Sequence, residues 1–491
     1  MTRRWGIGCD SIRSTEVNGT ACSARSSTAA ALRLCYGCVT AVLPAAAYPV
    51  QRLGVESWPE CRSVALPRRT CKVLASRAIP CNAMTDRSTV LVSVHGSDRP
   101  GITASLMEVL SDTGADIYDV EQIVVRGRLT LNVLIGVPGE RATIRDLLLF
   151  GWDNDLHLEF EVLDEAPTPA RQMAIVTMIG VTVGPGEFGA VADAIAAGGG
   201  NIERISRLSK YPVVSYELVV SSGDLDEMRA GLVEAAARLS IDVAIQPDGL
   251  LRRAKRIMVM DVDSTLIEDE VIDLLAEEAG VRDEVEGLTA AALAGEIDFE
   301  QSLRRRVELL EGLDEAALAR VAEEISLTRG ARTFIRTVKR LGMVTAVISA
   351  GFSQFTDPVA EELGIRYSLS NTLEVVEGRL TGRLIGEIVD GAAKARFLRS
   401  VAEAEGVPLS QVVAVGDGAN DLEMLAAAGL GIAFNAKPLV GDSADAALSV
   451  PYLDAILFLM GVRREHVDAA DAADVDFDQK PLIDVPGTPT I

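Results

Sequence analysis

Cysteine and histidine are scarce in most of this chain. All seven cysteines lie before Met84, so disulfide bonds play no part in residues 84–491, as expected in a reducing cytoplasm. Cys35 and Cys38 form a CxxC pair, but no second pair follows and no histidine precedes His95. We therefore expect no zinc site in this segment. The whole chain has only three histidines, which leaves few positions for histidine-based catalysis.

Basic charge and long apolar runs are also lacking. Lysine and arginine total 47 against 71 aspartates and glutamates, a formal net charge of −24. Nucleic-acid binding requires basic surfaces, so nucleic acid is excluded as a partner. No run of about 18 apolar residues occurs, which excludes a membrane-spanning helix. A chain of 491 residues exceeds a single hydrophobic core and predicts several domains.

Residues 1–83 differ from the rest in composition. They contain eleven basic and four acidic residues and are rich in Arg, Ser and Ala, without sustained periodicity. This composition is typical of a transit peptide. It also fits a start codon assigned too early, which we favour because Met84 opens an ordinary soluble sequence. Either interpretation predicts that residues 1–83 are disordered.

Two segments after Met84 share one order of expected elements. Residues 84–167 predict strand, helix, two strands, helix and strand, and residues 168–250 repeat this order. A βαββαβ order is that of a ferredoxin-like domain. Gly101 aligns with Gly186 near the start of the first helix in each copy. Free N–H groups at a helix start favour an anion, and glycine lets a carboxylate approach.

The buried strand expected at 257–260 ends in the sequence Asp261-Val-Asp263-Ser-Thr265. Two carboxylates at the end of a buried strand cost stability unless a cation neutralises them. A simple turn would also account for Asp and Ser. The sequence at this position alone does not separate the two interpretations.

Three later motifs indicate that the two aspartates belong to a catalytic site and do not merely form a turn. Ser349 ends an expected strand, Lys394 begins an expected helix, and Asp417 follows another strand. Parallel strands end at one sheet edge, so these groups can meet the two aspartates. Carboxylates, a hydroxyl and a lysine suit phosphoryl transfer with a hard cation. No cysteine is available and no histidine lies near these motifs, so by elimination the nucleophile is a carboxylate.

From Arg256 to about Val462, these motifs in this order resemble the haloacid dehalogenase (HAD) superfamily. Four helices expected between residues 271 and 325 interrupt the α/β pattern, and the run FEQSLRRR (299–306) is similar to the cap signature of phosphoserine phosphatases. The repeats, with DRPGI at 98–102, resemble amino-acid-binding ACT domains. Paired ACT domains before such a catalytic domain are typical of actinobacterial phosphoserine phosphatases.

The resemblance implies a role for each matching residue. Asp261 is the expected nucleophile, and Asp263 the general acid and then base. The expected Mg²⁺ ligands are Asp261, Asp417 and the backbone region of Asp263, with Asp421 behind them. The remaining expected site residues bind phosphate (Ser349, Ala350, Gly351, Lys394), substrate (Glu270 the ammonium, Arg306 the carboxylate, Phe299 as a cover, Asn420) or effector (Asp98, Gly101, Gly186).

Three of these assignments leave alternatives open. Ala350 stands where the family has a second glycine, which would strain the phosphate loop if a positive φ is needed there. Arg306 is one of three adjacent arginines, so a solvent-exposed role stays open for it. Glu268 and Asp269 compete with Glu270.

The predicted architecture is multidomain, α/β and α+β. It comprises two ferredoxin-like ACT domains (84–167 and 168–250), a Rossmann-like HAD core (251–463) with a helical cap at about 267–328, and a flexible acidic tail (464–491). The predicted function is Mg²⁺-dependent hydrolysis of O-phospho-L-serine through a phosphoaspartyl intermediate, the last step of serine biosynthesis, in a cytoplasmic homodimer regulated by an amino acid, serine being favoured. Alternatives are a phosphatase of another small phosphomonoester or a phosphoprotein, and an amino-acid sensor with a vestigial catalytic domain.

Overall fold

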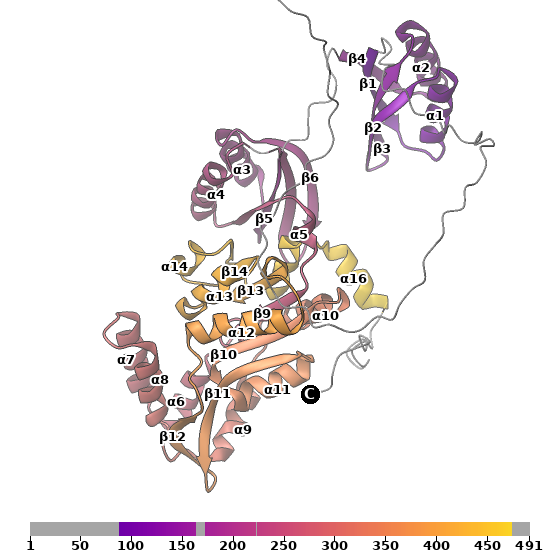
Figure 1. The fold of residues 1–491 in the computed structure, drawn as a ribbon. Helices are drawn as coiled ribbons and strands as arrows, with labels where there is room; N and C mark the ends of the chain where they lie inside the picture. Colours follow the sequence, from indigo (N-terminus) through magenta and orange to yellow (C-terminus); the bar gives the residue numbers. More distant parts are fainter. Residues whose placement is uncertain (1–87, 164–171, 222, 474–491) are drawn as a thin grey trace, which may run out of the picture. The chain divides into compact units, whose positions relative to one another are not determined.

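The computed structural model describes residues 88–163, 172–221 and 223–473. These ranges contain three β-sheets, one in each predicted domain (Figure 1). The extension predicted at 1–83 and the residues after 473 lie outside the described part. None of the described helices is both long and apolar enough to cross a membrane.

The first domain has four antiparallel strands and two helices. Its elements are β1 (Ser88–Ser97), α1 (Ile102–Asp112), β2 (Asp116–Val125), β3 (Arg128–Val137), α2 (Glu140–Asn154) and β4 (His157–Leu163). The strand order is β2-β3-β1-β4. Alternate residues of β1 and β3, such as Val92 and its partner Val133, are buried in one core with Leu106 of α1. This alternation is the period of two that a half-covered sheet imposes on its sequence.

The second domain repeats this arrangement. Its elements are β5 (Met173–Gly180), α3 (Pro185–Ala197), β6 (Asn201–Ser209), β7 (Val214–Ser221), α4 (Leu225–Leu239) and β8 (Asp242–Pro247), with strand order β6-β7-β5-β8. The predicted βαββαβ repeat is therefore confirmed. The two helix starts differ in one detail: Gly101 is the N-cap of α1, whereas Gly186 lies in the first turn of α3, whose N-cap is Gly184. The reason is Pro185, which suits the first helical position and starts the helix before Gly186.

The third sheet has seven strands in the order β12-β11-β10-β9-β13-β14-β15. Its strands are β9 (Ile257–Met260), β10 (Val344–Phe352), β11 (Tyr367–Val376), β12 (Arg379–Ile385), β13 (Val412–Gly416), β14 (Gly431–Phe434) and β15 (Ala446–Leu448). All neighbours are parallel except the β11–β12 hairpin. β9 is central and belongs to two cores, Met258 to one and Val259 to the other. Burial on both faces explains its unbroken apolar run.

Helices cover this sheet and form a separate cap. The four cap helices are α6 (Val271–Ala279), α7 (Arg282–Leu293), α8 (Phe299–Glu308) and α9 (Glu315–Glu324). The others are α5 (Leu250–Arg253), α10 (Ala331–Arg340), α11 (Ser353–Leu363), α12 (Gly391–Ala404), α13 (Leu422–Ala427), α14 (Pro438–Gly441), α15 (Ile456–Leu459) and α16 (Arg464–Ala473). Asp298 and Asp314 cap α8 and α9 by accepting backbone N–H bonds, which fixes where two of the predicted cap helices begin.

The predicted flexible tail is wrong for its first ten residues, because they form helix α16. Val467 on this helix is buried. Arg464 bonds Asp454 at 2.6 Å, and Arg340 forms an ion pair with Asp471. Acidic composition predicted disorder, but here a buried apolar contact and arginine partners outweigh it.

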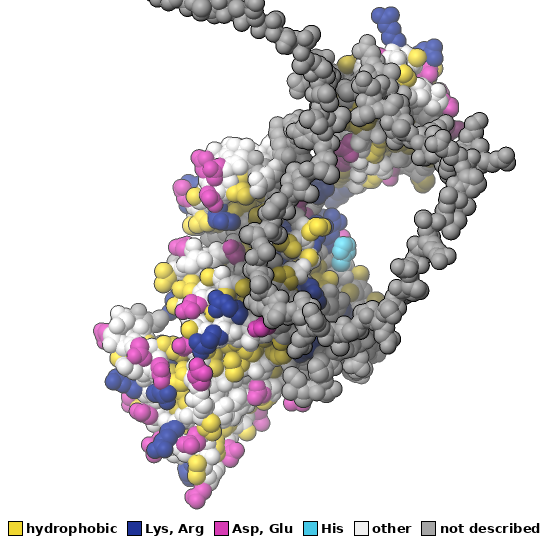
Figure 2. Space-filling model, viewed as in Figure 1, with side chains coloured by type: hydrophobic (Ala, Val, Ile, Leu, Met, Phe, Trp, Pro, Cys, Tyr) yellow, Lys and Arg dark blue, Asp and Glu magenta, His cyan; other side chains and the backbone are white. Residues whose placement is uncertain are grey.

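The face shown in Figure 2 mixes acidic and basic side chains. Magenta and dark blue side chains alternate over the catalytic domain without forming a continuous basic stripe on that face.

Candidate active site

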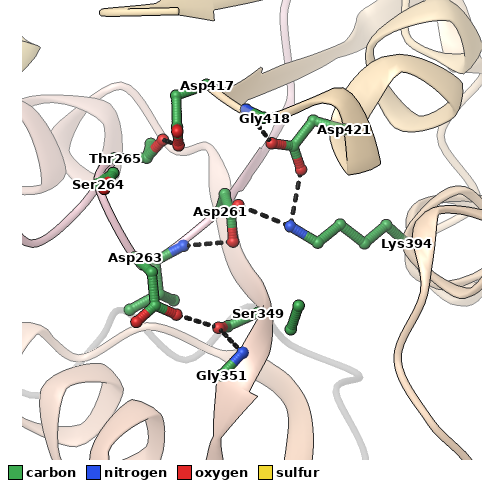
Figure 3. A network of polar contacts seen from close by, with 12 residues as sticks. Asp261, Asp263, Ser264, Thr265, Ser349, Gly351, Lys394, Asp417, Gly418 and Asp421 are labelled. Atoms are coloured by element: carbon green, nitrogen blue, oxygen red, sulfur yellow. Dashed lines mark hydrogen bonds and ion pairs between the residues drawn. The ribbon is translucent and has the colours of Figure 1, made fainter. Parts of the chain in front are cut away.

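The predicted catalytic residues lie at the carboxyl ends of neighbouring parallel strands. β9 pairs with β10 on one side and with β13 on the other. Asp261 follows β9, Ser349 lies near the end of β10, and Asp417 follows β13 (Figure 3). The parallel order thus brings three motifs, far apart in the chain, to one sheet edge.

Lys394 joins two buried carboxylates. Its Nζ atom lies 2.6 Å from Oδ2 of Asp261 and 2.7 Å from Oδ1 of Asp421, and all three residues are buried. Burial raises the pKa of Asp261 well above its usual value; the charge of Asp421 adds to this and that of Lys394 opposes it. Burial alone would lower the pKa of Lys394, but the two carboxylates outweigh it and raise that pKa. One cation is shared between two acids.

A third carboxylate leaves this cluster short of positive charge. Oxygens of Asp261, Asp417 and Asp421 lie within 4.8 Å of one another. Thr265 donates its hydroxyl to Oδ1 of Asp417 at 2.8 Å, and burial raises the pKa of Asp417 to about 6. Buried carboxylate oxygens in excess of their cations are the ligand set of a hard divalent ion. The residues present therefore fit a metal ion, with Asp421 already engaged by the lysine and by the N–H of Gly418 at 2.9 Å.

The side chain of Asp263 points to the other side of the site, toward Ser349. The Ser349 hydroxyl donates to Oδ2 of Asp263 at 2.6 Å, and Oγ accepts the Gly351 N–H at 2.6 Å. The Val271 N–H donates to Oδ1 at 3.0 Å. A Cβ atom at position 351 would lie 2.5 Å from Asp263 Oδ2 and 2.9 Å from Ser349 Oγ, so a side chain there would displace both groups. Ala350 lies within β10 without a positive φ, so the strain considered for it does not arise.

Glu270 and Arg306 are the charged residues on the cap side. Glu270 accepts the Ser264 hydroxyl at 2.8 Å. Desolvation of the carboxyl group and the charge of Asp263 raise its pKa to about 7. Arg306 on α8 interacts with the Glu270 charge, and its buried Nε has no hydrogen-bond partner among the described residues. Its Nη1 reaches only Thr289, at 3.5 Å. An anionic ligand group would satisfy this guanidinium.

The remaining predicted substrate residues flank these groups. Phe299 opens α8 and packs half-buried against the core. Asn420 lies in the 3₁₀ turn η2 (Ala419–Asp421), next to Asp421.

Three residues were not assigned from the sequence: Ser264, Thr265 and Asp273, the last of which interacts with the Arg306 charge. Ser264 and Thr265 stand inside the DxDST motif, which was the available signal. Asp273 lies three residues after Glu270. Residues three apart lie on the same side of a helix, so both carboxylates are on one side of the start of α6.

The helix starts in the two ACT domains differ. Gly101, with φ of +98°, precedes α1 as an N-cap without a side-chain hydrogen bond, and apart from its chain neighbours no atom of the described residues lies within 4 Å of where its Cβ would be. In α3, Glu187 Oε2 accepts the N–H of Gly184 at 2.9 Å, so this helix start already faces a carboxylate. Asp98 is exposed in the loop before α1, and its N–H bonds Gly127 O at 2.8 Å.

The fold and the site together define a haloacid dehalogenase-like hydrolase, and that family matches residues 258–426. ACT domain families match residues 88–161 and 173–246. The phosphoserine phosphatase of Streptomyces coelicolor is 50% identical over 415 residues, covering 82% of this chain and 98% of its own length. That of Mycobacterium tuberculosis is 47% identical over 401 residues, covering 80% and 97%. The chain therefore belongs to the phosphoserine phosphatase family.

Solved structures agree with the fold. A HAD family hydrolase of Salmonella enterica has a TM-score of 0.54 and 28% identity, covering 59% of this chain and 98% of its own. The predicted fold class of ACT domains followed by a HAD core is confirmed by these matches.

Proposed function

We propose that this enzyme hydrolyses O-phospho-L-serine to L-serine and phosphate with Mg²⁺, as the last step of serine biosynthesis. The observation that carries the proposal is Asp261, a carboxylate 2.6 Å from the buried Nζ of Lys394 at the edge where the other motifs meet. Glu270 and Arg306 offer one anion and one cation, which match the ammonium and carboxylate of serine. The names of the relatives support the same substrate.

In the first step, an oxygen of Asp261 attacks phosphorus. The new bond from Asp261 to phosphorus forms as the bond from phosphorus to the seryl oxygen breaks, and Asp263 gives that oxygen a proton. Lys394, the Ser349 hydroxyl and the Gly351 N–H hold the phosphate oxygens.

In the second step, Asp263 acts as a base. It takes a proton from a water molecule whose oxygen attacks phosphorus, and the bond to Asp261 breaks. Phosphate leaves, and both aspartates return to their starting forms. The two steps use one residue first as acid and then as base.

Asp261, Asp417 and the backbone at Asp263 would hold Mg²⁺, with Asp421 behind them. Bound there, the ion would offset the negative charge that grows on the phosphoryl group. Lys394 alone cannot do so, because Asp261 and Asp421 already share it.

The test is phosphate release by the wild-type chain and by Asp261→Asn, with and without Mg²⁺. We expect Mg²⁺-dependent release from phosphoserine and none above background from the variant, because its amide cannot attack. Asp263→Asn should slow both steps and allow some trapped phosphoenzyme, because no base remains to activate the water that would hydrolyse it. Phosphothreonine, p-nitrophenyl phosphate and a phosphoserine peptide serve as competing substrates. A preference for one of them would support the alternative phosphatases, and no release from any would support a vestigial catalytic domain.

We further propose that the first ACT domain binds an amino acid, serine being favoured, and that the chain forms a homodimer through its ACT domains. The uncapped start of α1 at Gly101 supports the ligand, and the Glu187 cap makes α3 a weaker candidate.

A further inference from the structure

The two ACT sheets differ in whether their helix-free face is covered. In the second domain this face carries nine side chains from three strands, and all nine are buried: Ile175, Thr177, Ile179, Ser215, Glu217, Val219, Asp242, Ala244 and Gln246. Polar residues make up five of them. Polar side chains are rarely buried unless another surface covers and bonds them.

The described residues do not bury the same face of the first domain. The registered equivalents on β1, β3 and β4 are Leu91, Ser93, His95, Thr130, Asn132, Leu134, His157, Glu159 and Glu161, and none of them is buried. Both domains have the same strand order. Burial of this face is therefore a property of the second domain and not of the fold.

The catalytic domain covers this face of the second domain. Ile179 and Ala244 belong to the same apolar core as the catalytic sheet. Gln246 donates to the carbonyl of Leu459 at 3.0 Å. Glu217 forms a buried ion pair with Arg252 at 2.7 Å. The interface thus has an apolar core and bonded polar groups at Gln246 and Glu217, whereas the hydroxyl oxygens of Thr177 and Ser215 have no hydrogen-bond partner among the described residues.

Asp242 makes the most specific of these contacts. Its carboxylate accepts the Ser449 N–H and hydroxyl, both at 2.8 Å, and the Val450 N–H at 3.3 Å. Ser449 directly follows β15 at the carboxyl edge of the catalytic sheet. One buried carboxylate thus holds three donors of the chain that leaves the sheet.

Hydrogen bonds connect this segment to the catalytic loop. The Leu453 N–H bonds the Arg329 carbonyl at 2.8 Å. The next residue back, Thr328, donates its hydroxyl to the carbonyl of Thr265 at 2.7 Å. Thr265 in turn holds Asp417. Asp242 is therefore connected to Asp417 by hydrogen bonds that alternate with short stretches of backbone, the longest of which runs through Pro451 and Tyr452.

We propose that Asp242 is a positioning residue of the active site, and that the second ACT domain is a permanent part of the catalytic unit. Its carboxylate fixes residues 449–450, and these fix the segment at 328–329 that orients Thr265 and Asp417. The metal-dependent part of this inference rests on the proposed Mg²⁺ site.

The test compares Asp242→Asn with Asp226→Asn in the full chain. The first change is isosteric; it removes the negative charge and replaces one of the two oxygens that accept from Ser449 and Val450 by an NH2 group, which cannot accept. The control changes an aspartate side chain that is 96% exposed on α4 of the same domain. We expect Asp242→Asn to lower kcat about tenfold and to raise the Mg²⁺ concentration for half-maximal activity about tenfold, with little change in KM.

A second readout does not depend on activity or metal. Amide hydrogen exchange of segment 262–267, measured without Mg²⁺, should be faster in Asp242→Asn and unchanged in Asp226→Asn. The N–H groups of Thr265, Leu266 and Ile267 all bond the Val262 carbonyl, so loosening of this loop is directly visible. Activity is also measured with p-nitrophenyl phosphate, so that failure of the wild type on phosphoserine would overturn the substrate proposal and leave this test intact.

A double-mutant cycle with Thr328→Val tests the route. If both residues act on one path, the double variant should lose little more activity than the worse single variant. Additive losses would overturn the route through Thr328. A lower melting temperature for Asp242→Asn, with kcat, Mg²⁺ dependence and exchange at 262–267 unchanged well below it, would show that Asp242 is only structural. That outcome would overturn the positioning role.

Discussion

At the scale of single residues, charge balance decides what the site can do. Lys394 is completely buried, yet charged, because Asp261 and Asp421 contact it at 2.6 and 2.7 Å. Breaking a buried ion pair by removing one partner is costly, because the other charge stays behind without compensation.

Lys394→Met should therefore destabilise the protein by about 3–5 kcal/mol and abolish activity. Without the lysine charge, the pKa of Asp261 would rise further above its unfolded value. A raised carboxylate pKa penalises the folded state where the group must ionise, so the loss should shrink as pH falls from 8 to 5. Denaturant unfolding at both pH values measures this. Lys255→Met is the control, since among the described residues Lys255 hydrogen-bonds the backbone carbonyls of Ser410 and Gly429 and its charge interacts with Asp445 without a hydrogen bond to it; an equal loss there would contradict the argument.

Ionisation of the Glu270 carboxyl group should make substrate binding depend on pH. Its pKa is raised to about 7, and only the ionised form attracts an ammonium group. KM for phosphoserine should therefore rise as pH falls through about 7, and Glu270→Gln should have a high KM that no longer changes there. Steady-state kinetics with p-nitrophenyl phosphate, which has no ammonium, gives the reference. The same pH profile in the variant and the wild type would assign the titration to another group.

At the scale of elements, the end of strand β10 shapes the phosphate loop. Gly351 is confined by Asp263 on one side and Ser349 on the other, while Ala350 uses its carbonyl to accept the Asn371 side chain at 2.7 Å. Position 350 therefore accommodates a side chain, whereas position 351 in the same strand does not accommodate one without displacing its neighbours.

Gly351→Ala should lower kcat by about 100-fold, because a Cβ at 2.5 Å from Asp263 Oδ2 displaces the acid by a few tenths of an ångström or more. Ala350→Gly, the matched change at the neighbouring position, should leave kcat nearly unchanged, with at most about 1 kcal/mol lost in stability. Kinetics and thermal unfolding of both variants measure this. A comparable loss of kcat in both would mean that the backbone of the loop, and not the space beside Asp263, limits catalysis.

At the scale of the whole molecule, the two ACT domains differ in whether they share a hydrophobic core with the catalytic domain. The second shares a core with the catalytic domain, whereas the first has its own core and an uncapped helix start at Gly101. The proposed effector site thus lies in the domain whose helix-free sheet face is uncovered.

Serine should inhibit the full chain without competing with phosphoserine, and Gly101→Val should weaken this inhibition about tenfold or more while uninhibited turnover changes little. A side chain at 101 would occupy the space a ligand carboxylate needs. Gly114→Ala is the control, because Gly114 also has a positive φ and open surroundings but lies after the helix end. Purely competitive inhibition, or equal inhibition of Gly101→Val, would place the serine in the active site.

Several features followed from local sequence because they depend on neighbours in the chain. The alternating strands of the ACT repeats, the apolar run of β9 and the capped starts of α8 and α9 are of this kind. The catalytic edge was also predictable, since Asp261, Ser349 and Asp417 each end a strand and parallel strands share an edge.

The tertiary structure alone decided three other features. Helix α16 forms because Val467 finds a buried place and Arg340 meets Asp471, a residue 131 positions later. The catalytic domain covers the helix-free face of the second ACT sheet. The hydrogen bonds from Ser449 to the Asp242 carboxylate join residues 207 positions apart. Contacts at such separation leave no periodic pattern, because they depend on which surfaces pack together and not on the period of either segment.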